Sequence, residues 1–197
     1  LRCHAPMAWL AGKSQPTNGA NIDASNRDGV SCDFCHRMVD PIYQNGVSPV
    51  EDQAVLSAML PAHVPTTRGT GQYVVDSNVR RRGPFADPVT PHSFLQSPFH
   101  TKSEICATCH DVSNPVFKRV SGARYTPGPF DTPPDTMHSN VLMPLERTYS
   151  EWLNSAFASG PIDMGGRFGG NEPLVSTCQD CHMPKTSGHG CDPSFGA

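Results

Sequence analysis

One short pattern, Cys-x-x-Cys-His, constrains this chain more than any other feature. Three complete copies occur, SCDFCH, CATCH and CQDCH, with their cysteines and histidines at Cys32, Cys35 and His36, at Cys106, Cys109 and His110, and at Cys178, Cys181 and His182. The chain opens on LRCH, which has the form of the end of a fourth copy. Of the 8 cysteines, only Cys191 lies outside the pattern. Whatever the motif binds therefore organises the fold.

Three kinds of site use a Cys-x-x-Cys pair: a zinc knuckle, a dithiol redox centre and a haem attachment site. Zinc takes its other ligands from a second knuckle and does not require His directly after the second Cys. With 9 His among 197 residues, His at this place in all three copies has a chance probability on the order of 10⁻⁴. A dithiol redox centre uses one motif in a βαβ unit, not three in a chain rich in Pro and Gly.

Covalent haem attachment explains every position of the motif. Two thiols three residues apart lie on one side of a helical turn, where they can form thioethers with the two vinyl groups along one porphyrin edge. The next residue then presents its imidazole to the iron. We expect four c-type haems, with thioethers at Cys3, Cys32, Cys35, Cys106, Cys109, Cys178 and Cys181 and proximal ligands at His4, His36, His110 and His182. For the first copy, a single thioether and a Cys preceding Leu1 both remain open.

The remaining five histidines are the candidates for the distal ligands: His63, His92, His100, His138 and His189. We expect bis-histidine ligation, because the supply of His matches the demand of four irons. His92 and His100 are eight residues apart with Pro98 between them, so they can face different haems. Met is the alternative sixth ligand, but the methionines fit packing positions better, and Met7 and Met183 follow a proximal His too closely.

Composition narrows the fold class. The 20 Pro and 17 Gly make up roughly a fifth of the chain, against a usual share of about 12%. We expect a mostly irregular fold with short α-helices and little β, a multihaem cytochrome c fold organised around a stacked haem chain. Residues 1–197 form a single domain in this prediction, and the ends suggest a processed or partial chain. The formal charge of −3 offers no basic footprint for nucleic acid, and no apolar run is long enough for a transmembrane segment.

Local patterns predict several elements. Helices are expected over 49–60, with Ser48 as N-cap, and over 148–158, with a capping box of Thr148 and Glu151. Capping boxes are also expected before two motifs, at Thr101 with Glu104 and at Ser176 with Gln179, which places those cysteines on short helices. Residues 71–76 and 116–125 have strand composition and are a possible pair. Loops are expected over 13–29, 61–70, 126–136 and 160–173.

Two features outside the motifs have open interpretations. The run Arg80, Arg81, Arg82 can pair with haem propionates, form a solvated face, or dock a partner. Cys191 is expected to be buried or disulfide-bonded to a partner beyond the visible sequence.

With the motifs interpreted as haem sites, the chain resembles the multihaem c-type cytochromes. GVSCDFCH, CATCH and CQDCHMP are similar to the branch related to hydroxylamine oxidoreductase and pentahaem nitrite reductase. The likeness covers the motifs and their immediate flanks. It implies export before haem attachment, hence a periplasmic or extracellular location, closely packed haems, and conduction of electrons along the irons.

Three functions fit these expectations. The first is an electron-transfer protein whose four haems are mainly bis-His ligated. The second is a reductase or oxidase of small nitrogen compounds, which would need one five-coordinate haem. The third is a subunit of a larger or polymeric assembly, such as a haem wire, that donates a His to a neighbour's haem. The expected partners are redox proteins or further copies of the chain.

Overall fold

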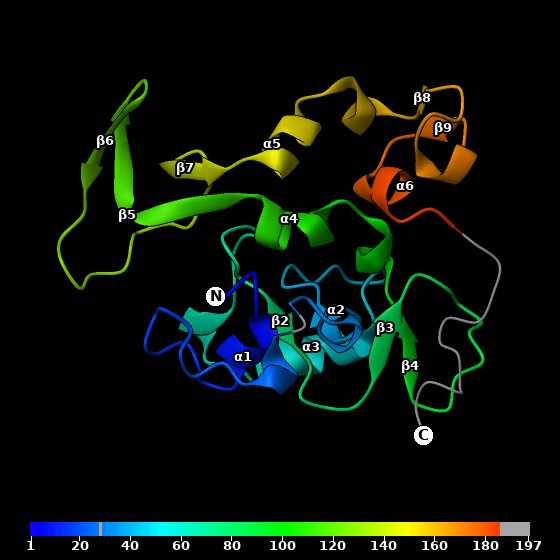
Figure 1. Ribbon diagram of the computed structural model, residues 1–197, viewed down its shortest axis with the longest axis horizontal. Coiled ribbons are helices and arrows are strands. Elements are labelled where there is room, and N and C mark those ends of the chain that lie inside the picture. Colours follow the sequence, from blue (N-terminus) through cyan, green and yellow to red (C-terminus); the bar gives the residue numbers. More distant parts are fainter. Residues whose placement is uncertain (28, 186–197) are drawn as a thin grey trace. The chain divides into compact units, whose positions relative to one another are not determined.

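Short helices and small sheets joined by long loops make up this chain (Figure 1). The computed structural model describes residues 1–27 and 29–185. The chain divides into two compact units, Leu1–Ser150 and Glu151–Ala197. These observations confirm the prediction of short helices with little β, whereas the arrangement around a haem chain stays a prediction.

The α-helices are all brief. They are α1 (Pro6–Leu10), α2 (Cys32–Arg37), α3 (Val50–Ser57), α4 (Glu104–His110), α5 (Thr148–Leu153) and α6 (Cys178–His182). Single 3-10 turns occur at Ala24–Asn26, Pro61–His63, Pro98–Thr101, Ala156–Ser159 and Gly169–Asn171. Within the described ranges, no helix has the length and apolar content needed to cross a bilayer.

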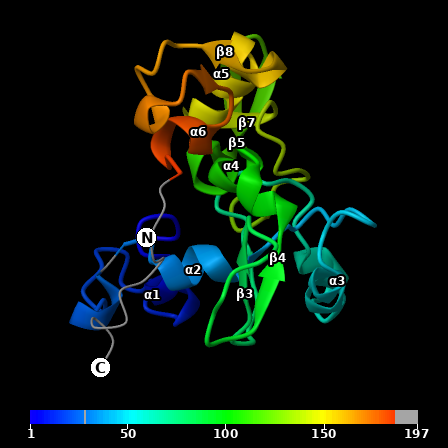
Figure 2. The ribbon, with the colours of Figure 1, turned by 90° about the vertical axis from the view of Figure 1, so that its right-hand side faces the viewer.

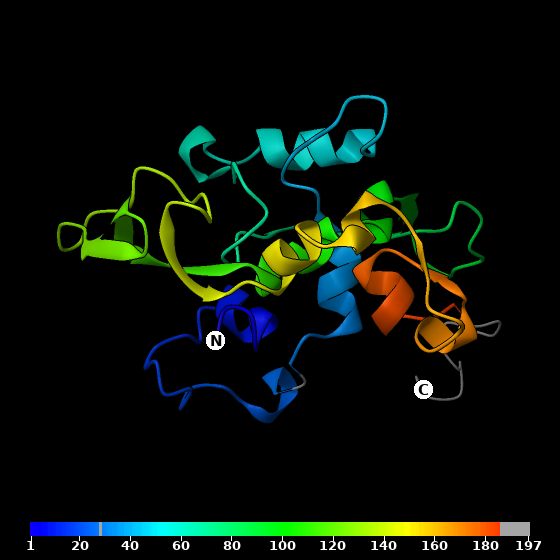
Figure 3. The same cartoon turned by 90° about the horizontal axis from the view of Figure 1, so that it is seen from above.

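Two helices differ from their expected bounds. Helix α3, flanked by loops on both sides (Figure 3), begins at Val50 after Pro49, and no side chain caps it. The Ser48 hydroxyl instead accepts a hydrogen bond from the Gln44 amide, so the predicted N-cap was wrong. Helix α5 ends at Leu153, and a separate 3-10 turn follows. The Ser155 amide and hydroxyl both bond to the Trp152 carbonyl, which ends the α-helical pattern there.

In the described residues the strands form four small sheets. β1 (Met38–Val39) pairs antiparallel with β2 (Val74–Val75), and β3 (Arg81–Gly83) pairs in parallel with β4 (Phe94–Gln96), beside which it lies in Figure 2. β5 (Val112–Ser121) is the central strand between β6 (Arg124–Pro127) and β7 (Leu142–Glu146). In the second unit, β8 (Ile162–Asp163) pairs with β9 (Leu174–Val175).

The expected pairing of residues 71–76 with 116–125 was wrong. Only Val74 and Val75 of the first segment are in a strand, and their partner is β1. The second segment folds back on itself as the β5–β6 hairpin, because Gly122 at φ 51° allows the reversal.

The main hydrophobic core of the first unit contains Phe34, Met38, Tyr73 and Phe99. Met7, Trp9, Cys35, Val75 and Ile105 pack against it. The Tyr73 ring meets the rings of Phe34 and Trp9 edge-on, with centroids 4.8 and 6.0 Å apart. This cluster therefore joins the segments that carry the first three motifs.

A tight loop holds the C-terminal end of helix α4. The Thr70 amide donates to the Asp111 carbonyl at 2.9 Å, and the Gly71 amide donates to the Thr108 carbonyl at 2.7 Å. Gly69 passes so close that a β-carbon there would lie 2.8 Å from the Asp111 carbonyl oxygen. Only glycine fits at this place without displacing the third motif.

We therefore expect Gly69→Ala to lower the free energy of unfolding by about 1–3 kcal/mol, because backbone must move to admit the methyl group. Denaturant unfolding measures this change. Gly128→Ala is the matched control, since its β-carbon would lie at an ordinary 3.6 Å from the Val116 carbonyl oxygen. Equal stability of the two variants would contradict the close approach at Gly69.

Candidate haem-binding sites

Each complete motif lies on a short helix, which confirms the prediction made for the motifs that begin at Cys106 and Cys178. In α2 and α6 the first Cys opens the helix, and in α4 the motif forms the last five residues. All seven described motif cysteines are free thiols. The motif histidines are exposed at or near the helix ends. The three helices thus present two thiols on one face and an accessible imidazole, which is the donor set that haem c requires.

The caps of these helices are not where the sequence placed them. Ser103, not Thr101, precedes α4, and the Thr101 hydroxyl donates to the Pro98 carbonyl within the preceding turn. Helix α6 has a capping box, but Thr177 and Asp180 form it, one residue beyond the predicted pair. Helix α2 is capped by the Ser31 hydroxyl, which accepts from the Phe34 amide at 3.3 Å.

His36 is oriented by a backbone carbonyl. Its Nδ1 lies 2.6 Å from the carbonyl oxygen of Arg82 in β3. A carbonyl only accepts, so Nδ1 carries the hydrogen and Nε2 keeps its lone pair. This is the tautomer and the kind of outer hydrogen bond that metal-ligating histidines use. His36 is therefore prepared to bind iron through Nε2, and the motif fits the haem that the sequence implies.

The first and third motifs meet at their thiols. The Cys3 and Cys109 side chains hydrogen-bond to one another, and this bond lowers the pKa of Cys3 to about 7. The pKa of Cys109, as the donor, is raised by the same bond and by burial. The porphyrin edges anchored by these two thiols would therefore be neighbours.

This contact has a measurable consequence in the haem-free chain. At pH 7 a large share of Cys3 is thiolate, the nucleophilic form, so iodoacetamide should modify it readily. Cys109→Ala removes the hydrogen bond and returns the pKa of Cys3 toward its ordinary value of about 8.5, so its alkylation at pH 7 should slow on the order of 10-fold. Peptide mapping after timed labelling measures the rate. Cys106→Ala is the control, and equal slowing in both variants would contradict the contact.

His100 lies against the second motif. Its Nε2 donates to the Cys35 carbonyl at 2.9 Å, and its ring is nearly parallel to that of His36, with centroids 6.2 Å apart and an angle of 19°. Burial is the main cause that lowers its pKa to about 4. The imidazole is therefore neutral at pH 7, as iron ligation demands. Among the four distal candidates that the structure describes, His63, His92, His100 and His138, His100 is the one whose ring stacks beside that of a proximal ligand.

The other distal candidates have different surroundings. His138 lines a cavity of about 120 Å³ together with Ala107 of the third motif, and its Nδ1 accepts from the Asn140 amide at 3.2 Å. His63 ends a 3-10 turn and His92 lies in the loop between β3 and β4, both with exposed side chains. His189 and Cys191 lie outside the described residues. The ligand roles of all five stay predictions.

In residues 1–27 and 29–185, no group of three or more His, Cys, Asp or Glu side chains is close enough together to bind a metal ion without a haem.

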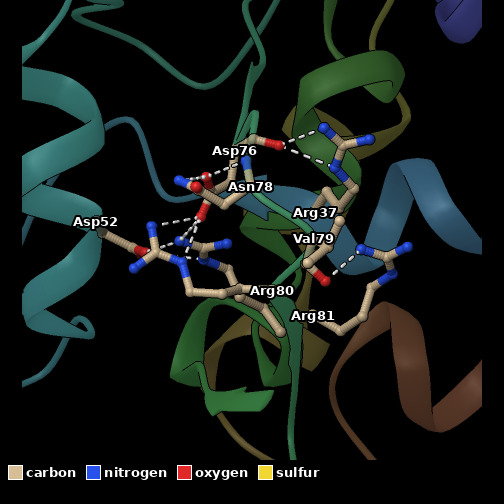
Figure 4. A network of polar contacts seen from close by, with 8 residues as sticks. Arg37, Asp52, Asp76, Asn78, Val79, Arg80 and Arg81 are labelled. Carbon is tan, nitrogen blue, oxygen red and sulfur yellow. Dashed lines mark hydrogen bonds and ion pairs between the residues drawn. The ribbon is translucent and has the colours of Figure 1, made fainter. Parts of the chain in front are cut away.

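The three arginines of the run differ in burial: Arg82 is fully buried, whereas the side chains of Arg80 and Arg81 are each 26% exposed. The side chain of Arg82 is 0% exposed and lies between Asp52 and Asp76, at 2.8 and 2.9 Å. Arg80 also pairs with Asp76 at 2.9 Å (Figure 4), and Arg81 pairs with Asp33. All three arginines thus have carboxylate partners within the chain, and pairing with haem propionates stays a prediction.

The sequence did not single out Asp52 and Asp76. No motif contains them, and their common partner lies 30 residues after one and six after the other. Burial raises the pKa of Asp52, against the effect of Arg82. Burial acts in the same direction on Asp76, but hydrogen bonds from Asn78 and Arg82 outweigh it and lower its pKa.

Known proteins give no further guide to these sites. No protein-family model, no curated protein and no solved structure matches the chain.

Proposed function

We propose that this chain is a tetrahaem c-type cytochrome that transfers electrons, with mainly bis-histidine ligation. The motif geometry carries the proposal: three helices present paired thiols and an exposed imidazole, and one of these imidazoles is already held in the iron-binding tautomer. When bound, each haem takes up and releases one electron at its iron. The thioether cysteines would fix the porphyrins, and the histidines would set the potentials.

Electron transfer also needs closely spaced centres. The first three motifs surround one hydrophobic core, and the thiols of Cys3 and Cys109 touch. Burial keeps His100 neutral beside the second motif, and because its Nε2 donates to the Cys35 carbonyl, its Nδ1 is the nitrogen that would ligate an iron. The fourth motif belongs to the unit that begins at Glu151.

Attachment of c-type haems implies export, so we place the protein in the periplasm or outside the cell. Its partners would be other redox proteins or further copies of itself in a larger assembly. Light scattering of the purified protein at several concentrations separates a monomer from a polymer.

The spin state of the oxidised, haem-loaded protein tests the proposal. Bis-histidine irons are low-spin, so we expect electron paramagnetic resonance to give low-spin signals alone, unchanged by nitrite or cyanide. A substantial high-spin signal that shifts on adding either anion would contradict pure conduction. It would favour a multihaem enzyme with one five-coordinate haem acting on small nitrogen compounds.

A further inference from the structure

A buried cluster of charged residues includes Arg82, whose backbone carbonyl contacts His36. It consists of Asp52, Asp76 and Arg82, whose side chains are each 0% exposed. Arg82 Nε and Nη2 both lie 2.8 Å from Asp52 Oδ1, and Nη2 lies 2.9 Å from Asp76 Oδ2. Isolated charges are costly to bury, so each of these groups depends on the others.

The cluster holds the proximal ligand by two routes. The first is the Arg82 carbonyl, which accepts the hydrogen of His36 Nδ1 at 2.6 Å. The second is Arg37, the residue after His36: its Nε and Nη2 donate to the Asp76 carbonyl at 2.8 and 2.6 Å (Figure 4). The Asp76 amide donates in return to the Arg37 carbonyl at 2.9 Å. Both the imidazole and the end of α2 are thus attached to this cluster.

The strand that carries the acceptor is itself fixed. Arg82 pairs with Leu95 in the β3–β4 ladder, and the following Gly83 carbonyl accepts from the Ser97 amide at 2.8 Å. A β-carbon at Gly83 would lie 3.7 Å from His36 Nδ1, so the ring packs directly on the strand. The backbone of Arg82 is therefore held against His36 by the β3–β4 ladder, while the side chain of the same residue is held in the cluster.

We propose that the Asp52–Asp76–Arg82 cluster positions His36 and thereby sets the reduction potential of the haem at the second motif. This inference rests on the proposed function. The hydrogen bond to Nδ1 makes the imidazole a stronger donor, which stabilises the oxidised iron. The carboxylates also offset the positive charge of Arg82, so removing either of them would leave more positive charge near the iron and favour an added electron.

Asp52→Asn tests the role of the cluster, because it keeps the shape of the side chain and removes one negative charge. The midpoint potential of a single haem should rise. At the ambient potential where that haem is half reduced in the unchanged protein, its ratio of reduced to oxidised iron should increase on the order of 10-fold. Spectroelectrochemical titration at pH 8 of the protein with its full haem content measures the four potentials.

Asp40→Asn is the matched control. Asp40 also forms a buried pair, with Arg68 at 2.8 and 3.0 Å, but Arg68 offers no acceptor to a motif histidine. Both substitutions remove a negative charge from this region and weaken an ion pair, but only Asp52 pairs with Arg82, whose carbonyl accepts from His36. If Asp52→Asn does not accumulate with its full haem content, Asp76→Asn is measured instead, with the same expected direction.

The outcomes separate the two proposals. A rise in one potential with Asp52→Asn, absent with Asp40→Asn, supports the positioning role. Unchanged potentials in the Asp52 or Asp76 variant overturn it, and so does an equal shift in the control. An unsubstituted chain that carries no covalent haem would instead overturn the proposed function.

Discussion

Replacing Cys106 and Cys109 together with alanine should reduce the covalent haem content from four per chain to three. These two thiols are the only attachment points of the third motif, and a porphyrin without thioethers is held by axial ligands alone. His110 would remain, but haem bound only in this way dissociates on denaturation. Extraction under acid conditions, followed by a pyridine haemochrome assay, measures the haem that stays bound.

Cys191→Ala is the control for this double substitution, because Cys191 is the one cysteine outside the motifs. It should leave the haem content unchanged. Retention of all four haems by the double variant would contradict attachment at the third motif. A loss of haem in the control would show that the motif cysteines are not the complete set.

Arg82→Met should lower the free energy of unfolding by about 3–5 kcal/mol, the usual cost of removing one partner from a buried ion pair. Its removal leaves the Asp52 carboxylate buried, and in the described part of the chain that carboxylate has no other cation within salt-bridge distance. Asp76 keeps Arg80 and Asn78 as partners, so the cost arises mainly at Asp52. Denaturant unfolding, followed by circular dichroism in the far ultraviolet, gives the difference.

The neighbouring Arg81→Met provides the comparison within the same strand. The side chains of Arg81 and its partner Asp33 are 26% and 36% exposed, and exposed pairs contribute about 0–1 kcal/mol. A small effect at Arg81 and a large one at Arg82 would show that burial, rather than the charge of the run, determines the cost. Equal, small effects would contradict the buried cluster.

The parts of the fold predicted correctly depend on residues close in sequence. A Cys-x-x-Cys-His segment places its thiols on one face of a helical turn, and the structure has a short helix at each complete motif. High Pro and Gly content indicated loops, and most of the chain between the motifs is irregular. The cap of α6 was missed by one residue, because Ser176 and Thr177 are adjacent hydroxyl residues and only Asp180 decides between them.

The parts that were missed depend on contacts between distant residues. The partner of β2 is β1, 36 residues earlier, and nothing in the local composition of residues 71–76 indicates this. The arginine run was open to interpretation as a solvated face, because two of its carboxylate partners, Asp33 and Asp52, lie far earlier in the chain. The contact between His36 and the Arg82 carbonyl could not be predicted from the sequence for a further reason. Every residue has a backbone carbonyl, and only the fold determines which one lies beside His36.

The mass of the intact, denatured protein tests the central claim most directly. The chain would be produced with export and haem-attachment machinery, unfolded in acid and measured by mass spectrometry. We expect the polypeptide mass plus four haems, with thioether-linked haem on the peptides that contain Cys3, Cys35, Cys109 and Cys181. The mass of the bare polypeptide with alkylatable motif cysteines would contradict the account.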